Sequence, residues 1–380
     1  MLHAYEARTL RQPAGASSLT IMDITAQAAR LPAFENHESI WLGRDEKRGL
    51  RAIVAIHDTT LGPALGGTRI WPYASFEEAL ADALRLSCGM TYKAAIADLP
   101  LGGGKAVIMA DPKTGKTAAL LAAYAEMLAA LNGQFITGED VGLTLADADF
   151  LRARTPNVTG TTRGGSGNPS PVTAKGVYLG IKAAAKHRFG TDDLTGRRVA
   201  VQGLGAVGSA LCEKLHRAGA SLAVADIDAA RVERACRDFG AAALATEEIL
   251  SADADIFAPC ALGGVLSEKT IPLLKAPIVA GSANNQLANH ADVRLLMERG
   301  ILYAPDYVIN AGGLINVAGE LAPGGYDPDA ALSRVATIPT VLADIFRRAD
   351  AEKRPTNDIA AEIALKRLQA AASQPPRVPI

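Results

Sequence analysis

The sequence predicts an α/β protein of two domains, the second of them a Rossmann-type domain built on a parallel sheet. The 380 residues exceed the size of one typical domain. Residues 159–171 are rich in Gly, Ser, Thr, Asn and Pro, a composition typical of a domain boundary. Beyond this stretch, strand and helix patterns alternate, and that order predicts right-handed crossovers between parallel strands.

The composition limits the classes of partner. Hydrophobic residues make up 49% and charged residues 21% of the chain, which indicates a globular protein with a sizeable core. The formal net charge of −1 disfavours nucleic acid and anionic membranes as partners. No apolar run reaches the ~18 residues of a membrane span, and the N-terminus lacks a signal-peptide pattern, so we expect a cytoplasmic protein. The four cysteines and six histidines form no ligand cluster, so we expect no metal site.

In the first half of the chain, short strand patterns are separated by longer helical ones. Two apolar runs within 39–56 flank residues 43–47, which predicts a hairpin with its turn there. Ser75 and Glu78 form a capping-box pattern that opens a helix reaching about Ala97. We further expect a strand at 106–109, a helix at 117–131, a strand at 135–136 and a helix that begins at Thr144.

The second half alternates more regularly. The predicted strands are 198–202, 221–225, 256–258, 277–280 and 301–303, and two late helices are expected at about 328–352 and 357–373. From these patterns we assign residues 1–158 with about 351–380 to a first α/β domain, and 159–350 to the Rossmann-type domain. Residues 1–38 show no clear periodicity, and we expect them to be an extension or a subunit contact.

A G-x-G-x-x-G motif follows the predicted strand 198–202 directly. Gly203 permits the tight turn, Gly205 lets the backbone approach a pyrophosphate, and Gly208 lets helix and strand pack closely. The next strand ends at Asp226, which suits an acceptor for the ribose 2′-hydroxyl and would repel a 2′-phosphate, so NAD is favoured over NADP. The residues assigned to the dinucleotide are Gly203, Leu204, Gly205, Ala206, Val207, Gly208 and Asp226.

Two lysines stand in unusual settings. Lys93 lies near the end of the helix that Ser75 opens, and Lys105 lies between three glycines and a core strand. Partial burial and a second nearby cation would both lower the pKa of a lysine and make it usable as a general base near neutral pH. From the residues alone, an ordinary lysine whose methylene chain packs on apolar neighbours remains the alternative for each.

The sequence resembles the glutamate/leucine/phenylalanine/valine dehydrogenase family, most closely its phenylalanine and leucine members, over about residues 40–370. The segments that carry the resemblance are 57–69 (HDTTLGPALGGTR), 89–93 (GMTYK), 102–105 (GGGK), 137–142 (TGEDVG), 171–174 (PVTA), 281–286 (GSANNQ) and 304–313 (APDYVINAGG). The resemblance implies that the first domain binds the substrate and mediates oligomerisation. It also implies a homo-oligomer, a dimer or an octamer.

The resemblance also implies roles for the site residues. Lys93 binds the substrate α-carboxylate beside the backbone of Gly67, Lys105 is the general base that activates water, and Asp140 is a second acid/base that exchanges protons with the amino group. Thr173 contacts the nicotinamide amide. Asn284 and Asn285 lie by the cofactor and the substrate amino group, and we assign Asn284 to the cofactor and Asn285 to the substrate, although the sequence does not decide which does what.

The implied reaction is NAD-dependent, reversible oxidative deamination. Hydride leaves the substrate α-carbon for the nicotinamide, water activated by Lys105 adds to the resulting iminium, and the carbinolamine releases ammonium to leave a 2-oxo acid. Relatives that use glutamate resemble one another in placing a Lys and a Ser where this chain has Leu65 and Val317. Burying a carboxylate against two aliphatic groups would cost several kcal/mol, so we expect an apolar substrate.

The preference among apolar substrates depends on Gly138 and Leu314. Aromatic-specific relatives resemble this chain at both positions, whereas branched-chain relatives often have Ala and Val there. Gly138 would open space for a ring and Leu314 would reshape the wall, so phenylalanine or another aromatic amino acid is favoured. A branched-chain dehydrogenase remains the alternative, followed by a non-catalytic NAD-binding sensor. A 2-hydroxy acid or alanine dehydrogenase is disfavoured, because Arg69 has no His companion in a similar motif.

Overall fold

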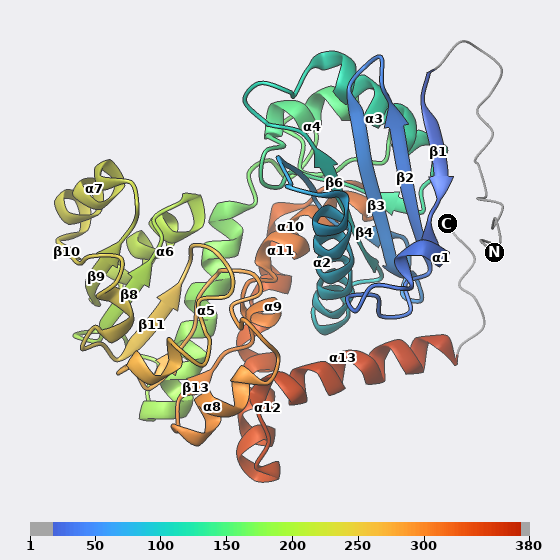
Figure 1. Ribbon diagram of the computed structural model, residues 1–380. Helices are drawn as coiled ribbons and strands as arrows, with labels where there is room; N and C mark the ends of the chain where they lie inside the picture. Colours follow the sequence, from blue (N-terminus) through green and yellow to red (C-terminus); the bar gives the residue numbers. More distant parts are fainter. Residues whose placement is uncertain (1–17, 374–380) are drawn as a thin grey trace. The chain divides into compact units, whose positions relative to one another are not determined.

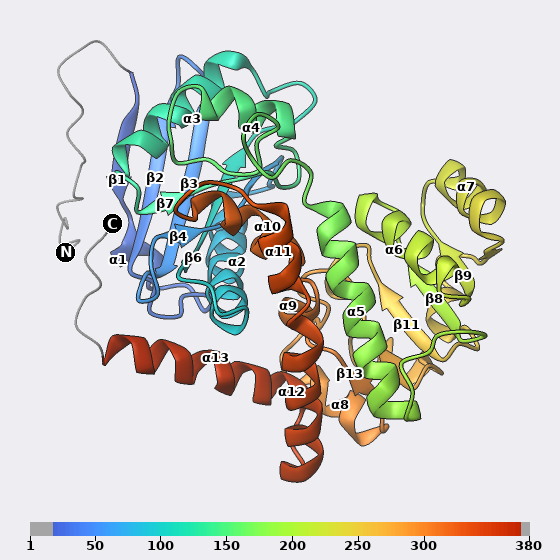
Figure 2. The ribbon, with the colours of Figure 1, turned by 180° about the vertical axis from the view of Figure 1, so that it is seen from behind.

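The computed structural model describes residues 18–373, and these form two compact units (Figures 1 and 2). The first unit contains residues 18–168, 317–326 and 367–373. The second contains residues 169–316 and 327–366. The domain limits given above stay a prediction. Within residues 18–373, no helix combines the length and the apolar character that a membrane crossing requires.

The first unit is built on a seven-stranded mixed sheet. Its main path runs β1-β2-β3-β6-β4-β7, and β5 pairs with β6 beside that path. β1, β2, β3 and β6 are antiparallel neighbours, whereas β4 and β5 run parallel to β6, and β7 runs parallel to β4. The strands are β1 (Thr20–Asp23), β2 (Ser39–Asp45), β3 (Leu50–Asp58), β4 (Ala64–Leu65), β5 (Thr68–Trp71), β6 (Gly102–Met109) and β7 (Phe135–Ile136).

The predicted hairpin is confirmed, but its turn lies at 46–49 rather than 43–47. Residues 43–45 continue β2, and Asp45 pairs with Leu50 at the strand ends. The Asp45 carboxylate accepts hydrogen bonds from the backbone N–H (3.0 Å) and the Nε (2.7 Å) of Arg48, and Gly49 supplies a φ of 74°. These interactions stabilise a turn placed later than the polar residues alone suggested.

The helices of the first unit are α1 (Thr25–Ala28), α2 (Phe76–Ile96), α3 (Ala118–Ala130) and α4 (Leu145–Arg152). Two apolar clusters show that α2 and α3 cover opposite faces of the sheet (Figures 1 and 2): α2 packs on Ile53, Ala55 and Val107, and α3 on the face of Ala52 and Val54. The Ser75 hydroxyl caps α2 by accepting from the N–H of Glu78, as predicted. The Glu78 carboxylate accepts from the N–H of Ala74 rather than from that of Ser75.

Two features of this unit differ from the sequence prediction. β1 and α1 lie within residues 1–38, where the sequence showed no clear periodicity, and residues 1–17 are outside the described part of the chain. β6 begins at Gly102 rather than at Ala106, so the three glycines belong to the strand. Glycine runs usually indicate loops, but here close neighbours on both sides hold them extended.

The second unit is built on a six-stranded parallel sheet of order β10-β9-β8-β11-β12-β13, which confirms the predicted Rossmann-type arrangement. The strands are β8 (Arg198–Gln202), β9 (Ser221–Ala225), β10 (Ala242–Ala243), β11 (Ile256–Pro259), β12 (Ile278–Val279) and β13 (Leu302–Tyr303). The helices up to residue 318 are α5 (Ser170–Phe189), α6 (Ala206–Arg217), α7 (Ala229–Phe239), α8 (Asp292–Glu298), α9 (Asp306–Ile309) and α10 (Gly312–Ala318).

The late helix predicted at 328–352 is two helices, α11 (Pro328–Val335) and α12 (Ile338–Glu352). Pro339 lies in the first turn of α12, and its ring would clash with the carbonyl of Val335 in a continuous helix. α13 (Thr356–Ala372) agrees with the second late helix.

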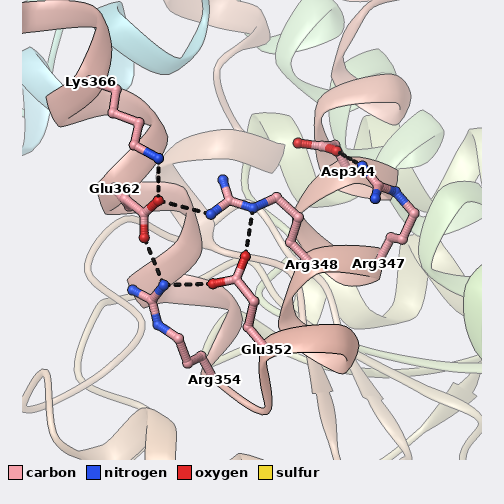
Figure 3. A network of polar contacts seen from close by, with 7 residues as sticks. All are labelled: Asp344, Arg347, Arg348, Glu352, Arg354, Glu362 and Lys366. Carbon is pink, nitrogen blue, oxygen red and sulfur yellow. Dashed lines mark hydrogen bonds and ion pairs between the residues drawn. The ribbon is translucent and has the colours of Figure 1, made fainter.

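An ionic network joins α12 to α13 (Figure 3). Glu362 accepts from Arg348 (2.9 Å), Arg354 (2.7 Å) and Lys366 (2.7 Å), and Glu352 binds both arginines. The hydrogen bonds from Lys366, Arg354 and Arg348 lower the pKa of Glu362 to about 2. Because the groups are partly or largely exposed to solvent, we expect the network to define the geometry of the junction more than to stabilise the fold.

Candidate active site

Strand β6 holds Lys105 on a backbone that its neighbours approach closely. A Cβ at Gly103 would collide with the backbone of Thr91 in α2, and a Cβ at Gly104 would lie 2.7 Å from the ring of Phe135 in β7. Only glycine permits both approaches. Gly103 and Gly104 therefore allow α2 and β7 to pack against the strand immediately before Lys105.

Lys105 and Asp140 form an ion pair through Nζ and Oδ2. The Lys105 side chain is 7% exposed and that of Asp140 18%. Asp140 follows β7 in a turn closed by hydrogen bonds between its backbone and that of Leu143. Gly67, between β4 and β5, lies beside the carboxylate: a Cβ there would be 3.1 Å from Oδ2. The structure thus brings together Lys105, Asp140 and Gly67 from three separate segments.

The pKa of Lys105 is lowered to about 7, first by burial and then by the charge of Arg69. Lys93 lowers it further, and Asp82 acts in the opposite direction. The pairing with Asp140 acts in the opposite direction to burial, because it favours the charged ammonium. A lysine that can lose its proton near neutral pH can act as a general base.

Lys93 lies in the last turn of α2 and is half-buried. Its charge acts on Lys105, so the two lysines share one electrostatic environment, as predicted. Packing between α2 and β6 accounts for this, because Thr91 contacts Gly103. Two cationic side chains and one carboxylate from separate elements can bind a small anionic molecule and move protons on it.

Lys116 stabilises the turn that carries Asp140 through hydrogen bonds to neighbouring residues. The Lys116 ammonium donates to the carbonyl of Gly142 (3.0 Å) and to Asp147 (2.5 Å). Asp147 completes a capping box with Thr144 at the start of α4. The turn therefore has a fixed support, and Asp140 does not depend on the ion pair alone for its position.

Leu65, Gly138 and Val317, which we predicted to contact the substrate side chain, all belong to the first unit and lie in two places. Leu65 is buried in β4. A Cβ at Gly138 would lie 3.3 Å from both the carbonyl oxygen and the hydroxyl of Thr159, and a Cβ at Gly160 would lie 3.7 Å from Val317. Thr159 and Gly160 thus connect Gly138 to Val317. The space that Gly138 leaves adjoins Thr159, and the expectation that it admits a ring stays a prediction.

The glycine-rich loop of the second unit fits a dinucleotide. Gly203 adopts a φ of 96° and donates from its N–H to the carbonyl of Ala225 (2.8 Å). A Cβ at Gly208 would collide with the carbonyl of Gly203, whereas a Cβ at Gly205 would meet no atom within 4 Å. Open space at Gly205, together with the uncapped start of α6, leaves backbone N–H groups available to a phosphate.

Asp226 lies at the end of β9, next to this loop. Its Oδ2 accepts from the N–H of Leu204 (2.5 Å), and its Oδ1 accepts from the N–H of Asp228 (2.9 Å). Arg231 approaches Oδ2 at 3.9 Å. A carboxylate oxygen can accept more than one hydrogen bond, so Asp226 retains acceptor capacity while it also anchors the loop.

The remaining predicted residues lie in the second unit. The Thr173 hydroxyl, in α5, donates to the carbonyl of Pro169 (3.0 Å). The Asn284 side-chain oxygen accepts from Asn310 (2.9 Å), Asn285 adopts a φ of 50°, and Leu314 is buried in α10. Ala206 and Val207 open α6.

Sequence reasoning missed several residues that the fold brings to these groups. Arg69 appeared only in a rival assignment, yet it binds Asp82 (2.8 Å) and acts on Lys105. Thr159 and Gly160 lie in the stretch that we interpreted as a boundary. No local pattern marks such contacts, except that Arg69 closes the segment 57–69. No group of three or more metal-ligating side chains gathers within residues 18–373.

The comparisons with known proteins identify the family. The Glu/Leu/Phe/Val dehydrogenase dimerisation domain matches residues 38–157, and the Glutamate/Leucine/Phenylalanine/Valine dehydrogenase domain matches residues 164–234 and 227–374. Leucine dehydrogenase of Geobacillus stearothermophilus is 51% identical over 88% of this chain and 91% of its own. Phenylalanine dehydrogenase of Lysinibacillus sphaericus is 47% identical over 83% and 84%.

The crystal structure of L-tryptophan dehydrogenase from Nostoc punctiforme superimposes with a TM-score of 0.76 at 48% identity, covering 89% of this chain and 98% of that one. The family domains span more than half of the chain, and relatives near 50% identity are named amino acid dehydrogenases. The chain therefore belongs to the glutamate/leucine/phenylalanine/valine dehydrogenase family, and the protein is an amino acid dehydrogenase.

Proposed function

We propose that the protein catalyses the NAD-dependent, reversible oxidative deamination of an apolar L-amino acid to its 2-oxo acid and ammonium. The observation that carries the proposal is the buried ion pair of Lys105 with Asp140 in the electrostatic environment of Lys93. An α-amino acid presents one carboxylate and one amino group. This cluster offers one cation for the carboxylate and an acid/base pair for the chemistry at the α-carbon.

Each group has a distinct role in the proposed reaction. Lys93 neutralises the substrate carboxylate beside the backbone of Gly67. Lys105, uncharged, takes a proton from the water that attacks the α-carbon of the iminium. Asp140 exchanges protons with the nitrogen that leaves as ammonia. The nicotinamide of the dinucleotide supplies the redox chemistry when bound, as acceptor of hydride from the α-carbon.

We propose NAD as the dinucleotide. Members of the family are pyridine nucleotide dependent, and the glycine-rich loop has the space and the backbone donors for a pyrophosphate. Asp226 holds a negative charge at the end of β9, where it would accept the 2′-hydroxyl of a ribose and repel a 2′-phosphate. Thr173 and Asn284 are proposed to contact the cofactor, and Asn285 the substrate amino group.

The proposed substrate side chain is apolar. Leu65 is buried and uncharged, and Val317 adjoins Gly160 in the same unit, so neither offers a partner to a γ-carboxylate. An unpaired carboxylate there would cost several kcal/mol. Leu314 is proposed to complete the wall.

Within this class we propose an aromatic amino acid. Gly138 lacks a side chain, and Leu314 stands where branched-chain relatives often have the shorter Val. One observation favours a branched-chain substrate instead. Thr159 lies close to Gly138, 3.3 Å from the position of a Cβ there, which supports a smaller substrate side chain on that side. Differences of a few methylenes in an apolar pocket change preference by only ~1–3 kcal/mol, so kinetic comparison decides between the two.

The test is a substrate panel. Formation of reduced dinucleotide is followed by absorbance with each proteinogenic L-amino acid and with NAD or NADP. We expect activity with apolar amino acids and NAD, and a higher kcat/KM for L-Phe or L-Trp than for L-Leu. Silence with every amino acid would support a non-catalytic sensor. A tenfold preference for L-Leu over L-Phe, about 1.4 kcal/mol, would establish the branched-chain alternative.

We also propose that the protein is a homo-oligomer, a dimer or an octamer. The first unit matches a domain described as a dimerisation domain. Light scattering coupled to size-exclusion chromatography gives the mass of the assembly, and a monomeric mass would contradict the proposal.

A further inference from the structure

Glu320 binds a loop that is far from it in sequence. It lies in the short 3-10 helix Gly319–Leu321, after α10, in the segment 317–326 that packs in the first unit. Its Oε1 accepts from the N–H of Gly160 (2.8 Å), the N–H of Ser166 (2.7 Å) and the hydroxyl of Ser166 (2.6 Å). A single carboxylate oxygen thus receives three donors from both ends of residues 160–166.

The loop is also shaped by its glycines and by other hydrogen bonds, among them one from the N–H of Gly167 to the carbonyl of Thr161 (3.0 Å). Glycines at 160, 164 and 167 adopt positive φ values of 72°, 72° and 64°, so the backbone there is intrinsically free. A second carboxylate, Asp149 of α4, accepts from the N–H (2.8 Å) and hydroxyl (2.5 Å) of Thr162. The carboxylate of Glu320 also approaches Gly165, where a Cβ would lie 2.9 Å from Oε2.

The anchored end of the loop lies beside Gly138 and Val317, which we propose to line the side-chain pocket. Thr159, next to Gly160, donates from its N–H (2.7 Å) and hydroxyl (3.1 Å) to the carbonyl of Thr137. Thr159 adjoins Gly138, and Gly160 adjoins Val317. We therefore expect a displacement of Gly160 to change the packing around Gly138 and Val317.

We infer that Glu320 is a positioning residue for substrate selection, acting through Gly160 and Thr159 on the pocket between Gly138 and Val317. This inference rests on the proposed function, because it takes that pocket to hold the substrate side chain. Charge-assisted hydrogen bonds are about twice as strong as neutral ones, which suits a carboxylate that must order a glycine-rich loop.

The test compares Glu320→Ala and Glu320→Gln with a matched control, Asp327→Ala. Asp327 also accepts two backbone N–H groups, those of Asp329 (2.9 Å) and Ala330 (3.2 Å), but at the start of α11. For Glu320→Ala we expect KM for the preferred amino acid to rise about tenfold and the Phe/Leu ratio of kcat/KM to move towards one, with kcat and the KM for dinucleotide changed less than about threefold. Glu320→Gln, which keeps an acceptor oxygen, should show a smaller effect, and Asp327→Ala none on KM.

Hydrogen exchange provides a second measurement. The amides of residues 160–166 should exchange faster in Glu320→Ala and not in Asp327→Ala. Unchanged amino acid KM and Phe/Leu ratio would overturn the inference, and so would an equal rise in dinucleotide KM, which would indicate a general structural defect. If Glu320→Ala does not fold, the same kinetic constants and exchange rates are measured in Glu320→Gln and Ser166→Ala, and the same outcomes support or overturn the inference. Wild-type enzyme inactive on apolar amino acids would reject the proposed function rather than this inference.

Discussion

The ammonium of Lys105 and the carboxylate of Asp140 form an ion pair at a largely buried position, with the backbone of Gly67 beside the carboxylate. The two residues come from β6 and from the turn after β7, which β4 separates in the sheet. Burial disfavours the charged form of the lysine and lowers the pKa of Lys105 to about 7.

The activity should depend on the protonation of Lys105. Its pKa is lowered to about 7, and the proposed base is the deprotonated amine, so kcat/KM should rise with pH through about 7 and then level off. The measurement is a pH profile of kcat/KM for the amino acid in saturating dinucleotide. An acidic limb more than about one pH unit below this value would contradict the role of Lys105 as base.

Removal of the charges of Asp82 and Arg69 should shift the acidic limb of the pH profile in opposite directions. Asp82 raises the pKa of Lys105, so Asp82→Asn should shift the limb to lower pH. Arg69 lowers it, so Arg69→Met should shift the limb to higher pH. Arg85 binds Asp82 (3.0 Å) but is largely exposed, and Arg85→Met serves as the control with no expected shift. Shifts of the same sign in both variants would refute this account.

Removal of either member of the ion pair should abolish most of the activity. General acid–base catalysis contributes about 10²–10⁴-fold, so Lys105→Met and Asp140→Asn should each lower kcat by a factor in this range. The glycine-rich loop lies in the other unit, so the affinity for reduced dinucleotide, measured by fluorescence titration, should stay unchanged. The exposed Lys113→Met is the control. A loss of less than about tenfold would exclude a catalytic role.

Two glycines of the dinucleotide loop should respond differently to the same substitution. In Gly208→Ala the new methyl collides with the carbonyl of Gly203, so the Tm should fall. In Gly205→Ala the methyl meets no protein atom within 4 Å, so the Tm should hold while dinucleotide affinity falls by about tenfold or more. Thermal unfolding with and without dinucleotide separates the two effects. Unchanged affinity in Gly205→Ala would place the pyrophosphate elsewhere.

The Gly138→Ala substitution should move the preference towards branched chains. The added methyl would lie 3.3 Å from Thr159, so it must displace Thr159 slightly and narrow the pocket. We expect the Leu/Phe ratio of kcat/KM to rise by about tenfold, in line with ~1–3 kcal/mol for small changes in apolar pockets. An unchanged ratio would remove Gly138 from the pocket.

Much of the fold followed from local patterns in the sequence. The strands around residues 198–202 and 221–225, the helix opened by Ser75 and the glycine-rich loop were each predictable, because capping, hydrophobic periodicity and turn chemistry depend on residues close in the chain. The resemblance in segments such as 102–105 and 137–142 indicated the family and nominated Lys93, Lys105 and Asp140.

Other features could not be predicted, because they depend on segments that meet only in the folded chain. The glycines at 102–104 form a strand only because β3 and β4 pair with them. By contrast, the helix break before Pro339 could have been predicted from the proline itself, and our sequence analysis missed it.

Local patterns in the chain were enough to predict the alternation of elements and the glycine-rich loop, because these depend on neighbouring residues, and the resemblance nominated the candidate site side chains. The folded chain was needed to reveal that Lys105 is buried against Asp140, that Thr159 lies beside Gly138, and that Glu320 accepts a hydrogen bond from Gly160. The physical reason is that burial, charge proximity and packing are set by long-range contacts, which no local pattern encodes.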